Sequence, residues 1–266
     1  MNPVAFEIFG VSIMWYGIFI SIGVLATIVY SSLILKKEGI YNEDDFFGLI
    51  IAVIVSGFIG ARLYYVFFNL DMYDSIFDIF NIRQGGLAFH GGVIFGLIAI
   101  ALYTRWKKMD TLRYMDIIGI GTLLAQATGR WGNFFNQEAH GSEVTKGFIE
   151  KFPAFIEKGM LIDGKYYHPT FLYESINGIF WFIVLTILIL KLTKLRKGTF
   201  IALAVIVNSI ARIAIEGLRT DSLMIGDIKV AQLIGGLAIF MSLVYLLYIY
   251  THDMFPSKKK KKKRNN

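Results

Sequence analysis

Three arginines, a histidine and several carboxylates lie inside or beside apolar stretches of this sequence. Arg62, Arg130 and Arg212 each follow a long run of hydrophobic residues, and His90 and Glu216 lie in similar surroundings. A guanidinium can bind a phosphate through two parallel hydrogen bonds, while an imidazole or a carboxylate can accept a proton. A charged side chain within a bilayer costs roughly 2.5–3.5 kcal/mol. Several charged side chains in apolar stretches therefore indicate a functional site, one that could bind an anion and move a proton.

The densest of these motifs is Gly-Arg-Trp-Gly-Asn-Phe-Phe-Asn-Gln-Glu at 129–138. Glycines flank Arg130, and glycine lets backbone approach a ligand closely. His90 is likewise followed by two glycines, although a single histidine is more often a hydrogen-bonding residue than a catalyst.

Arg212, Glu216 and Arg219 are spaced i, i+4, i+7 and therefore share one helix face. Two interpretations of this stripe remain open. It is either a self-neutralising row of ion pairs, or a positive surface tuned by Glu216 that accepts a phosphate.

The elements that position these residues are predicted to be membrane helices. The chain has 266 residues, is 55% hydrophobic and has a mean hydropathy of +0.56. A bilayer core needs about 20 apolar residues per helix. Seven stretches qualify, so we expect an all-α integral membrane protein with seven transmembrane helices, at about 12–35, 46–68, 87–104, 115–133, 171–190, 199–217 and 229–250.

Short basic loops follow the first, third and fifth spans, and a basic tail follows the seventh. The positive-inside rule then places the N-terminus outside and the C-terminus inside. With this topology the polar residues of six spans reach one level near the outer face, whereas the inner ends carry no comparable charges. The residues at this level are Tyr16, Arg62, His90, Arg130, Asn133, Glu138, Tyr173, Glu174, Arg212 and Glu216.

The extramembrane parts are small. We expect a transmembrane domain at 1–256, with an extracytoplasmic segment at 141–170 between spans four and five, and a basic cytoplasmic tail at 257–266. Asp163-Gly164 predicts a hairpin in the outer segment. The run 258–264 carries seven positive charges, and the other 20 Lys and Arg match the 20 Asp and Glu. Such a tail suits anionic membrane lipids, and the neutral body argues against nucleic-acid binding.

The sequence has no cysteine, so any thiol in its chemistry must belong to a substrate. The first apolar run has no preceding Lys or Arg and no small-residue cleavage site, which favours a retained span over a signal peptide.

Residues 129–141 resemble the signature of bacterial prolipoprotein diacylglyceryl transferases. Further similar blocks follow in the same order and cover nearly the whole chain: Trp15-Tyr16-Gly17, Gly60-Ala61-Arg62, His90-Gly91-Gly92, the piece from His168 to Glu174, and Arg212 to Glu216 through Arg219. The family's seven-span, N-outside architecture agrees with the topology above. Two positions depart from the family pattern, Phe171 in place of a glutamine and Asn208 in place of an aromatic residue, which affects local hydrogen bonding or substrate fit.

The resemblance implies transfer of the sn-1,2-diacylglyceryl group of phosphatidylglycerol to the lipobox cysteine thiol of a prolipoprotein signal peptide. A thioether forms and glycerol phosphate leaves. Cations must stabilise the leaving phosphate, and a base must help to form the thiolate. Both substrates would be met at the outer leaflet of the bacterial cytoplasmic membrane.

On this basis each candidate receives a role. Arg130 and Arg212 are the expected phosphate binders, with Arg62 and Arg219 as weaker candidates. Tyr16, Asn133 and Asn136 would position the headgroup or the acceptor. His90 is the preferred base, and Glu138 or Glu216 are the alternatives. No cofactor is expected, and no metal, because the histidines lack metal-site spacing.

Two other classes of protein compete with a transferase. A transporter or carrier with an outer-leaflet anionic-lipid site would also keep ionisable residues in its spans. The sequence, however, shows no internal repeat, and its polar residues occupy one depth instead of a path across the membrane. An intramembrane protease would need a Gly-x-Ser-x-Gly or His-Glu-x-x-His motif, and neither occurs.

Overall fold

The computed structural model describes residues 1–73, 75, 78–79, 85–220 and 222–252, with the side chain of residue 89 left out. The basic tail at 257–266 lies outside the described residues. The chain divides into two compact units. One comprises 1–31 and 116–266, and the other comprises 32–115.

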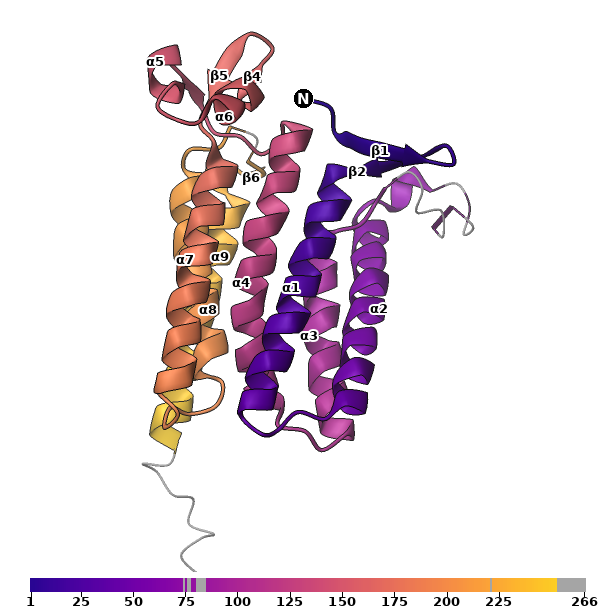
Figure 1. Cartoon of the computed structure of the whole chain (residues 1–266), viewed down its shortest axis with the longest axis vertical. Coiled ribbons are helices and arrows are strands. Elements are labelled where there is room, and N and C mark those ends of the chain that lie inside the picture. The colour runs from indigo at the N-terminus through magenta and orange to yellow at the C-terminus, as the bar shows by residue number, and fades with distance from the viewer. Residues whose placement is uncertain (74, 76–77, 80–84, 221, 253–266) are drawn as a thin grey trace, which may run out of the picture. The chain divides into compact units, whose positions relative to one another are not determined.

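The described residues contain seven long helices (Figure 1). They are α1 (Trp15–Lys37), α2 (Glu43–Phe68), α3 (Phe89–Trp106), α4 (Thr111–Asn136), α7 (Thr170–Lys191), α8 (Thr199–Glu216) and α9 (Val230–Thr251). Each coincides with one predicted span to within about four residues. Five of them, α1, α2, α7, α8 and α9, are long and apolar enough to cross a membrane. The chain is therefore a mostly helical membrane protein.

The expectation of an all-α fold is wrong in detail, because the described residues also form three small antiparallel sheets. Their strands are β1 (Val4–Ile8), β2 (Val11–Met14), β3 (Glu143–Val144), β4 (Leu161–Ile162), β5 (Lys165–Tyr167), β6 (Met224–Ile225) and β7 (Ile228–Lys229). A short 3-10 helix (Leu70–Met72) follows α2.

The first predicted span began at residue 12, but this residue lies in β2 and α1 begins at Trp15. The reason is period-two alternation. Phe6 and Ile8 pair with Ile13 and Val11 on one face of the hairpin, while Glu7 pairs with Ser12 on the other. Phe9 and Gly10 both have positive φ, at 49° and 77°, as a two-residue turn requires.

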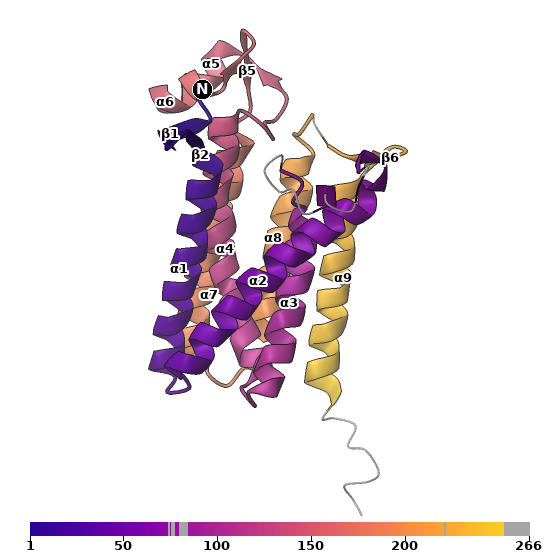
Figure 2. The ribbon, with the colours of Figure 1, turned by 90° about the vertical axis from the view of Figure 1, so that its right-hand side faces the viewer.

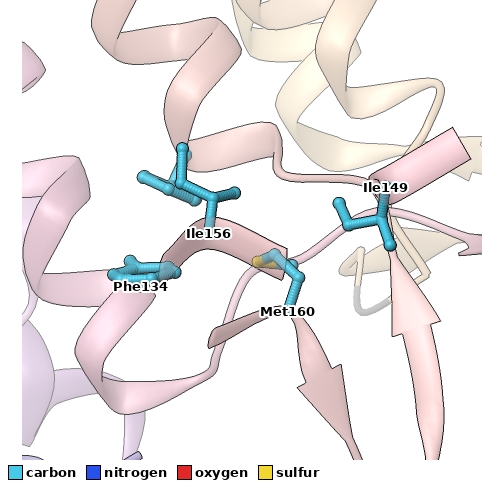
Figure 3. Packing of buried hydrophobic residues seen from close by; sticks show 5 residues of the cluster. Phe134, Ile149, Ile156 and Met160 are labelled. Carbon is cyan, nitrogen blue, oxygen red and sulfur yellow. The ribbon is translucent and has the colours of Figure 1, made fainter. Parts of the chain in front are cut away.

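The segment at 141–170 forms a sheet of order β3-β5-β4 with two short helices, α5 (Lys146–Ile149) and α6 (Ala154–Gly159). Asp163 and Gly164 take positive φ angles of 49° and 80° between β4 and β5, which confirms the predicted hairpin. The segment is held by an apolar cluster that joins it to the adjoining ends of α4 and α7 (Figure 3). Its buried members are Phe134, Ile149, Ile156, Met160 and Phe171.

In the unit formed by 32–115, α2 and α3 pack closely as they cross (Figure 2). Glycine permits this approach, because a Cβ atom at Gly91 would lie 2.3 Å from the carbonyl oxygen of Gly60. Small residues at helix contacts are typical of membrane proteins. At the opposite end of the unit, Arg113 pairs with Glu38.

In the other unit, Asp116 near the start of α4 is fully buried. Its two carboxylate oxygens accept hydrogen bonds of 2.8 Å from the backbone amides of Gly198 and Ile201. These amides belong to the first turn of α8 and have no partner within that helix. The prediction that the inner ends lack charges is therefore wrong for Asp116, which caps α8.

Candidate active site

The centre of the candidate site is a carboxylate held between two arginines from different helices. Glu174 lies in the first turns of α7, Arg130 in the last turns of α4, and Arg212 in the last turns of α8. Nη2 of Arg130 lies 2.5 Å from Oε2 of Glu174, and Nη1 of Arg212 donates to Oε1 over 3.1 Å. One carboxylate therefore bridges both guanidinium groups, which would otherwise repel each other in a low-dielectric setting.

The chain of charges continues along α8. Nη2 of Arg212 lies 2.7 Å from Oε2 of Glu216, whose side chain is 2% exposed. Nε of Arg219 lies 3.9 Å from the same oxygen. Lys229 donates from Nζ to the backbone carbonyls of Glu216 and Arg219, over 2.7 and 2.8 Å. Arg212, Glu216 and Arg219 therefore share one helix face, as predicted, and are ion-paired along it, and Arg212 joins them to Glu174.

A second group of polar residues surrounds the end of α4. Asn133 receives a long contact of 3.5 Å from Nη1 of Arg130, and its own amide donates to Oε1 of Glu138 over 2.9 Å. Asn136 donates to the same oxygen over 3.2 Å. Gln137 and Ala139, on either side of Glu138, have positive φ angles of 54° and 57°. This reversal after the helix turns Glu138 back toward the two asparagines.

Tyr16 lies against the same stretch of α4. A Cβ atom at Gly132 would lie 2.6 Å from Cδ2 of Tyr16, so only a glycine at this position lets the tyrosine pack against α4. Trp15 stacks on Phe135, with ring centroids 4.7 Å apart. A Cβ atom at Gly129 would have no other described group within 4 Å, so there is open space beside Arg130.

A cleft opens between α4, α7 and α8 at the bridging carboxylate. It is lined by Gln126, Arg130, Glu174, Asn177, Gly178, Asn208, Ala211 and Arg212. Both arginines of the bridge thus face one polar space. Such a space suits an anion that exchanges places with, or joins, the bridging carboxylate.

Arg62 and His90 belong to the other unit. Arg62 is 8% exposed and donates to four backbone carbonyls of the segment after α2. Its Nε bonds Ile79 at 2.6 Å, Nη2 bonds Asp78 at 3.1 Å, and Nη1 bonds Gly85 and Gly86 at 3.1 and 3.0 Å. His90 opens α3 with an exposed side chain, near the ring of Tyr64.

The structure thus brings together most of the residues predicted from the sequence. Those found in one unit are Tyr16, Arg130, Asn133, Asn136, Glu138, Arg212, Glu216 and Arg219. Glu174 was placed at the same level by the sequence but was given no role, and the structure makes it the central bridge. The amides of Gln126, Asn177 and Asn208 were missed as a group. The sequence could have predicted this group, because each amide stands three or four residues from a charged residue on the same helix and therefore shares its face.

Several apolar helices, which carry a partly buried chain of arginines and carboxylates, define the class of multi-span membrane proteins. The particular family follows from comparison with known sequences. The chain belongs to the prolipoprotein diacylglyceryl transferase family, whose sequence model matches residues 3–248. It is therefore a transferase.

Relatives with nearly the same length support this assignment. The chain is 48% identical to phosphatidylglycerol–prolipoprotein diacylglyceryl transferase 1 of Clostridium perfringens (strain 13 / Type A), over 98% of both chains. It is 49% identical to the phosphatidylglycerol–prolipoprotein diacylglyceryl transferase of Clostridium botulinum (strain Loch Maree / Type A3), over 94% of this chain and 97% of the relative. The similarity gives no support to a transporter.

Proposed function

We propose that this enzyme transfers the sn-1,2-diacylglyceryl group of phosphatidylglycerol to the lipobox cysteine of prolipoproteins, the first step of lipoprotein maturation. The observation that carries the proposal is the pair of arginines bridged by Glu174, in a chain of this family. The names of its relatives specify phosphatidylglycerol and a prolipoprotein as substrates. The cationic cleft suits the first of these, because its phosphate is the group that must be held and then released.

In the proposed reaction the cysteine sulfur attacks the glycerol carbon that carries the phosphate. A carbon–sulfur bond forms, the carbon–oxygen bond to phosphate breaks, and glycerol phosphate leaves with the electron pair. Arg130 and Arg212 stabilise the charge that grows on this leaving group, with Arg219 extending the positive surface. Asn133, Asn136 and Tyr16 position the headgroup or acceptor beside Arg130.

The thiol proton must pass to a base, because the thiolate is the nucleophile. We assign this role to His90, whose exposed imidazole stands at the start of α3. Glu138 and Glu216 are the alternatives. Glu138 already accepts hydrogen bonds from two asparagines, and Glu216 is already paired with Arg212. Both are therefore engaged in positioning other groups.

Arg62 is the weakest of the proposed phosphate binders. Each of its three guanidinium nitrogens already donates to a backbone carbonyl within its own unit. Its contribution to substrate binding would therefore have to come from charge at a distance.

We further propose that α3 and α4 cross the bilayer with the five apolar helices, so that the protein has seven spans with its N-terminus outside. Its location would be the bacterial cytoplasmic membrane, with the site at the outer leaflet and the outer segment at 141–170 beside it. The basic tail would attract anionic lipids at the inner face, with roughly 1 kcal/mol for each Lys near the surface.

Two experiments test these proposals. The purified enzyme is incubated with phosphatidylglycerol and a lipobox peptide, and mass spectrometry detects the added diacylglyceryl group. We expect addition to the Cys peptide and none to a Ser peptide, and absence of addition to either would refute the function. For the topology, the absence of native cysteine allows single-cysteine labelling. Labels at positions 163 and 226 should react from outside, and reaction from the cytoplasmic side would reverse the orientation.

A further inference from the structure

Three carboxamides form a second polar layer beneath the bridged arginines. Gln126 precedes Arg130 by four residues on α4, Asn177 follows Glu174 by three on α7, and Asn208 precedes Arg212 by four on α8. Since an α-helix rises 1.5 Å per residue, each amide lies about one turn nearer the middle of its helix than its charged neighbour. All three line the same cleft as Arg130, Glu174 and Arg212.

These amides have no evident structural task. Within the part of the chain that the structure describes, none of the three side chains forms a hydrogen bond with another group of the protein. Each is half-buried and lines the cleft, so a group that enters the cleft can reach it. Gly178 and Ala211 also line the cleft. A Cβ atom at Gly178 would lie 2.9 Å from the carbonyl oxygen of Leu123, so this glycine lets α7 approach α4 closely. Polar groups without partners, facing an open space, suit a ligand.

The position of the layer selects the ligand chemistry. In a glycerophospholipid the headgroup alcohol lies on one side of the phosphate, and the two ester carbonyls lie on the other side, toward the acyl chains. The amides lie on the mid-helix side of the arginines, which is the acyl side if the phosphate is held by Arg130 and Arg212. A carboxamide NH2 group donates hydrogen bonds, and an ester carbonyl only accepts them.

The geometry points to an ester subsite, in which Gln126, Asn177 and Asn208 donate hydrogen bonds to the acyl-ester carbonyls of the donor lipid. This inference rests on the proposed function for the identity of the lipid. It gives Asn208, which stands where the family often has an aromatic residue, a role in substrate recognition. The subsite would fix the glycerol backbone below the phosphate and so aim the reacting carbon at the thiol.

The test compares diester phosphatidylglycerol with its dialkyl ether analogue, which keeps the phosphate, the headgroup and the reacting carbon but lacks both carbonyls. Binding of each lipid to the purified full-length protein is measured by native mass spectrometry, and KM and kcat are measured for transfer to a lipobox peptide. A neutral hydrogen bond is worth a factor of about two to ten in affinity. We therefore expect the wild type to bind the diester about tenfold more tightly.

The combined variant Gln126→Met, Asn177→Leu and Asn208→Leu should bind both lipids equally. Arg130→Lys should weaken both and keep the ester preference, because both lipids carry the phosphate. Thr122→Val, one turn from Gln126 on α4 and absent from the cleft lining, is the matched control and should behave as the wild type. The thermal midpoint of the combined variant should not fall, since no intramolecular hydrogen bond is lost.

Equal binding of the two lipids by the wild type, or an ester preference that survives the triple substitution, would overturn the subsite. A fall in thermal midpoint with an unchanged ester preference would assign the amides a structural role instead. An ester preference in binding without any transfer to the peptide would refute the proposed reaction while leaving the subsite supported. The two proposals can therefore fail separately.

Discussion

The two ends of helix α4 carry charges that are satisfied in different ways, one buried and one partly exposed. Asp116, near its start, gives both oxygens to backbone amides of α8 and is 0% exposed. Arg130, near its end, pairs with Glu174 beside a cleft that is also lined by three carboxamides, to which the described residues offer no hydrogen-bond partner. Asp116 forms its hydrogen bonds within the fold and therefore stabilises the fold. Arg130 lies beside the cleft, and we propose that it binds a ligand there.

The largest effect should come from Arg130→Lys. Lysine keeps the charge but loses the planar fork that binds two oxygens at once. We expect transfer to fall at least about a hundredfold, the loss typical of removing a group that stabilises transition-state charge. Insertion and thermal midpoint should change little. The measurement is kcat/KM for the lipobox peptide, and full activity would remove Arg130 from the mechanism and erase the contrast with Asp116.

Asp116→Asn should have the opposite profile. The amide NH2 group would face a backbone N–H donor of α8, so one buried hydrogen bond is lost at a cost of about 1–3 kcal/mol. We expect a lower thermal midpoint in detergent, with kcat per folded molecule unchanged. Asp110→Asn serves as control, because Asp110 is half-buried just before α4 and an asparagine there can still accept the hydrogen bond that Oδ1 receives from the amide of Arg113. Lost activity in a fully stable Asp116→Asn protein would show that the capped end of α4 also takes part in the reaction.

Arg62→Lys sharpens the comparison. Like Arg130, Arg62 is an arginine within an apolar stretch of sequence, but like Asp116 it is hydrogen-bonded to backbone groups. A lysine ammonium cannot reach the four carbonyls that the guanidinium bonds. We expect faster hydrogen exchange of the amides at 85–90, with a loss of activity clearly smaller than for Arg130→Lys. Unchanged exchange together with a large rise in the KM for phosphatidylglycerol would instead make Arg62 a direct phosphate ligand.

The smallest effect concerns pH. Burial lowers the pKa of His168, which lies in the segment at 141–170 and pairs through Nδ1 with the hydroxyl of Tyr173, 3.1 Å away. The unfolded chain, with a histidine pKa of about 6.5, therefore takes up the proton first as pH falls. Stability from this group is present above pH 6.5 and is lost toward the folded pKa below it. Thermal midpoints recorded across this range should show a slope that His168→Gln removes, and an equal slope in that variant would contradict the assignment.

Much of this arrangement could be predicted because it depends on local sequence. The lengths of the apolar runs predicted all seven helices, and Asp163-Gly164 predicted its hairpin from turn chemistry alone. The i, i+4, i+7 spacing predicted the face shared by Arg212, Glu216 and Arg219. In each case the information lies within a few residues of chain.

The features that escaped prediction depend on contacts between distant residues. Asp116 looks like a stray charge until the first turn of α8 is placed beside it. Glu174 bridges arginines that are 44 and 38 residues away along the chain, so no local pattern reveals it. The N-terminal hairpin was missed because its apolar alternation runs directly into the apolar helix that follows.

The bridge made by Glu174 also bears on which anions the site can accept. Its carboxylate already neutralises part of the field of Arg130 and Arg212, so an arriving anion gains only the difference between its own attraction and that of the resident group. Chloride or acetate would gain little by this exchange. A phospholipid has a different advantage, because its acyl chains hold it in the bilayer, at roughly 0.8 kcal/mol for each buried CH2, and so keep it beside the helices. Because Glu174 is an internal counterion, we expect the site to select anionic lipids over small water-soluble anions.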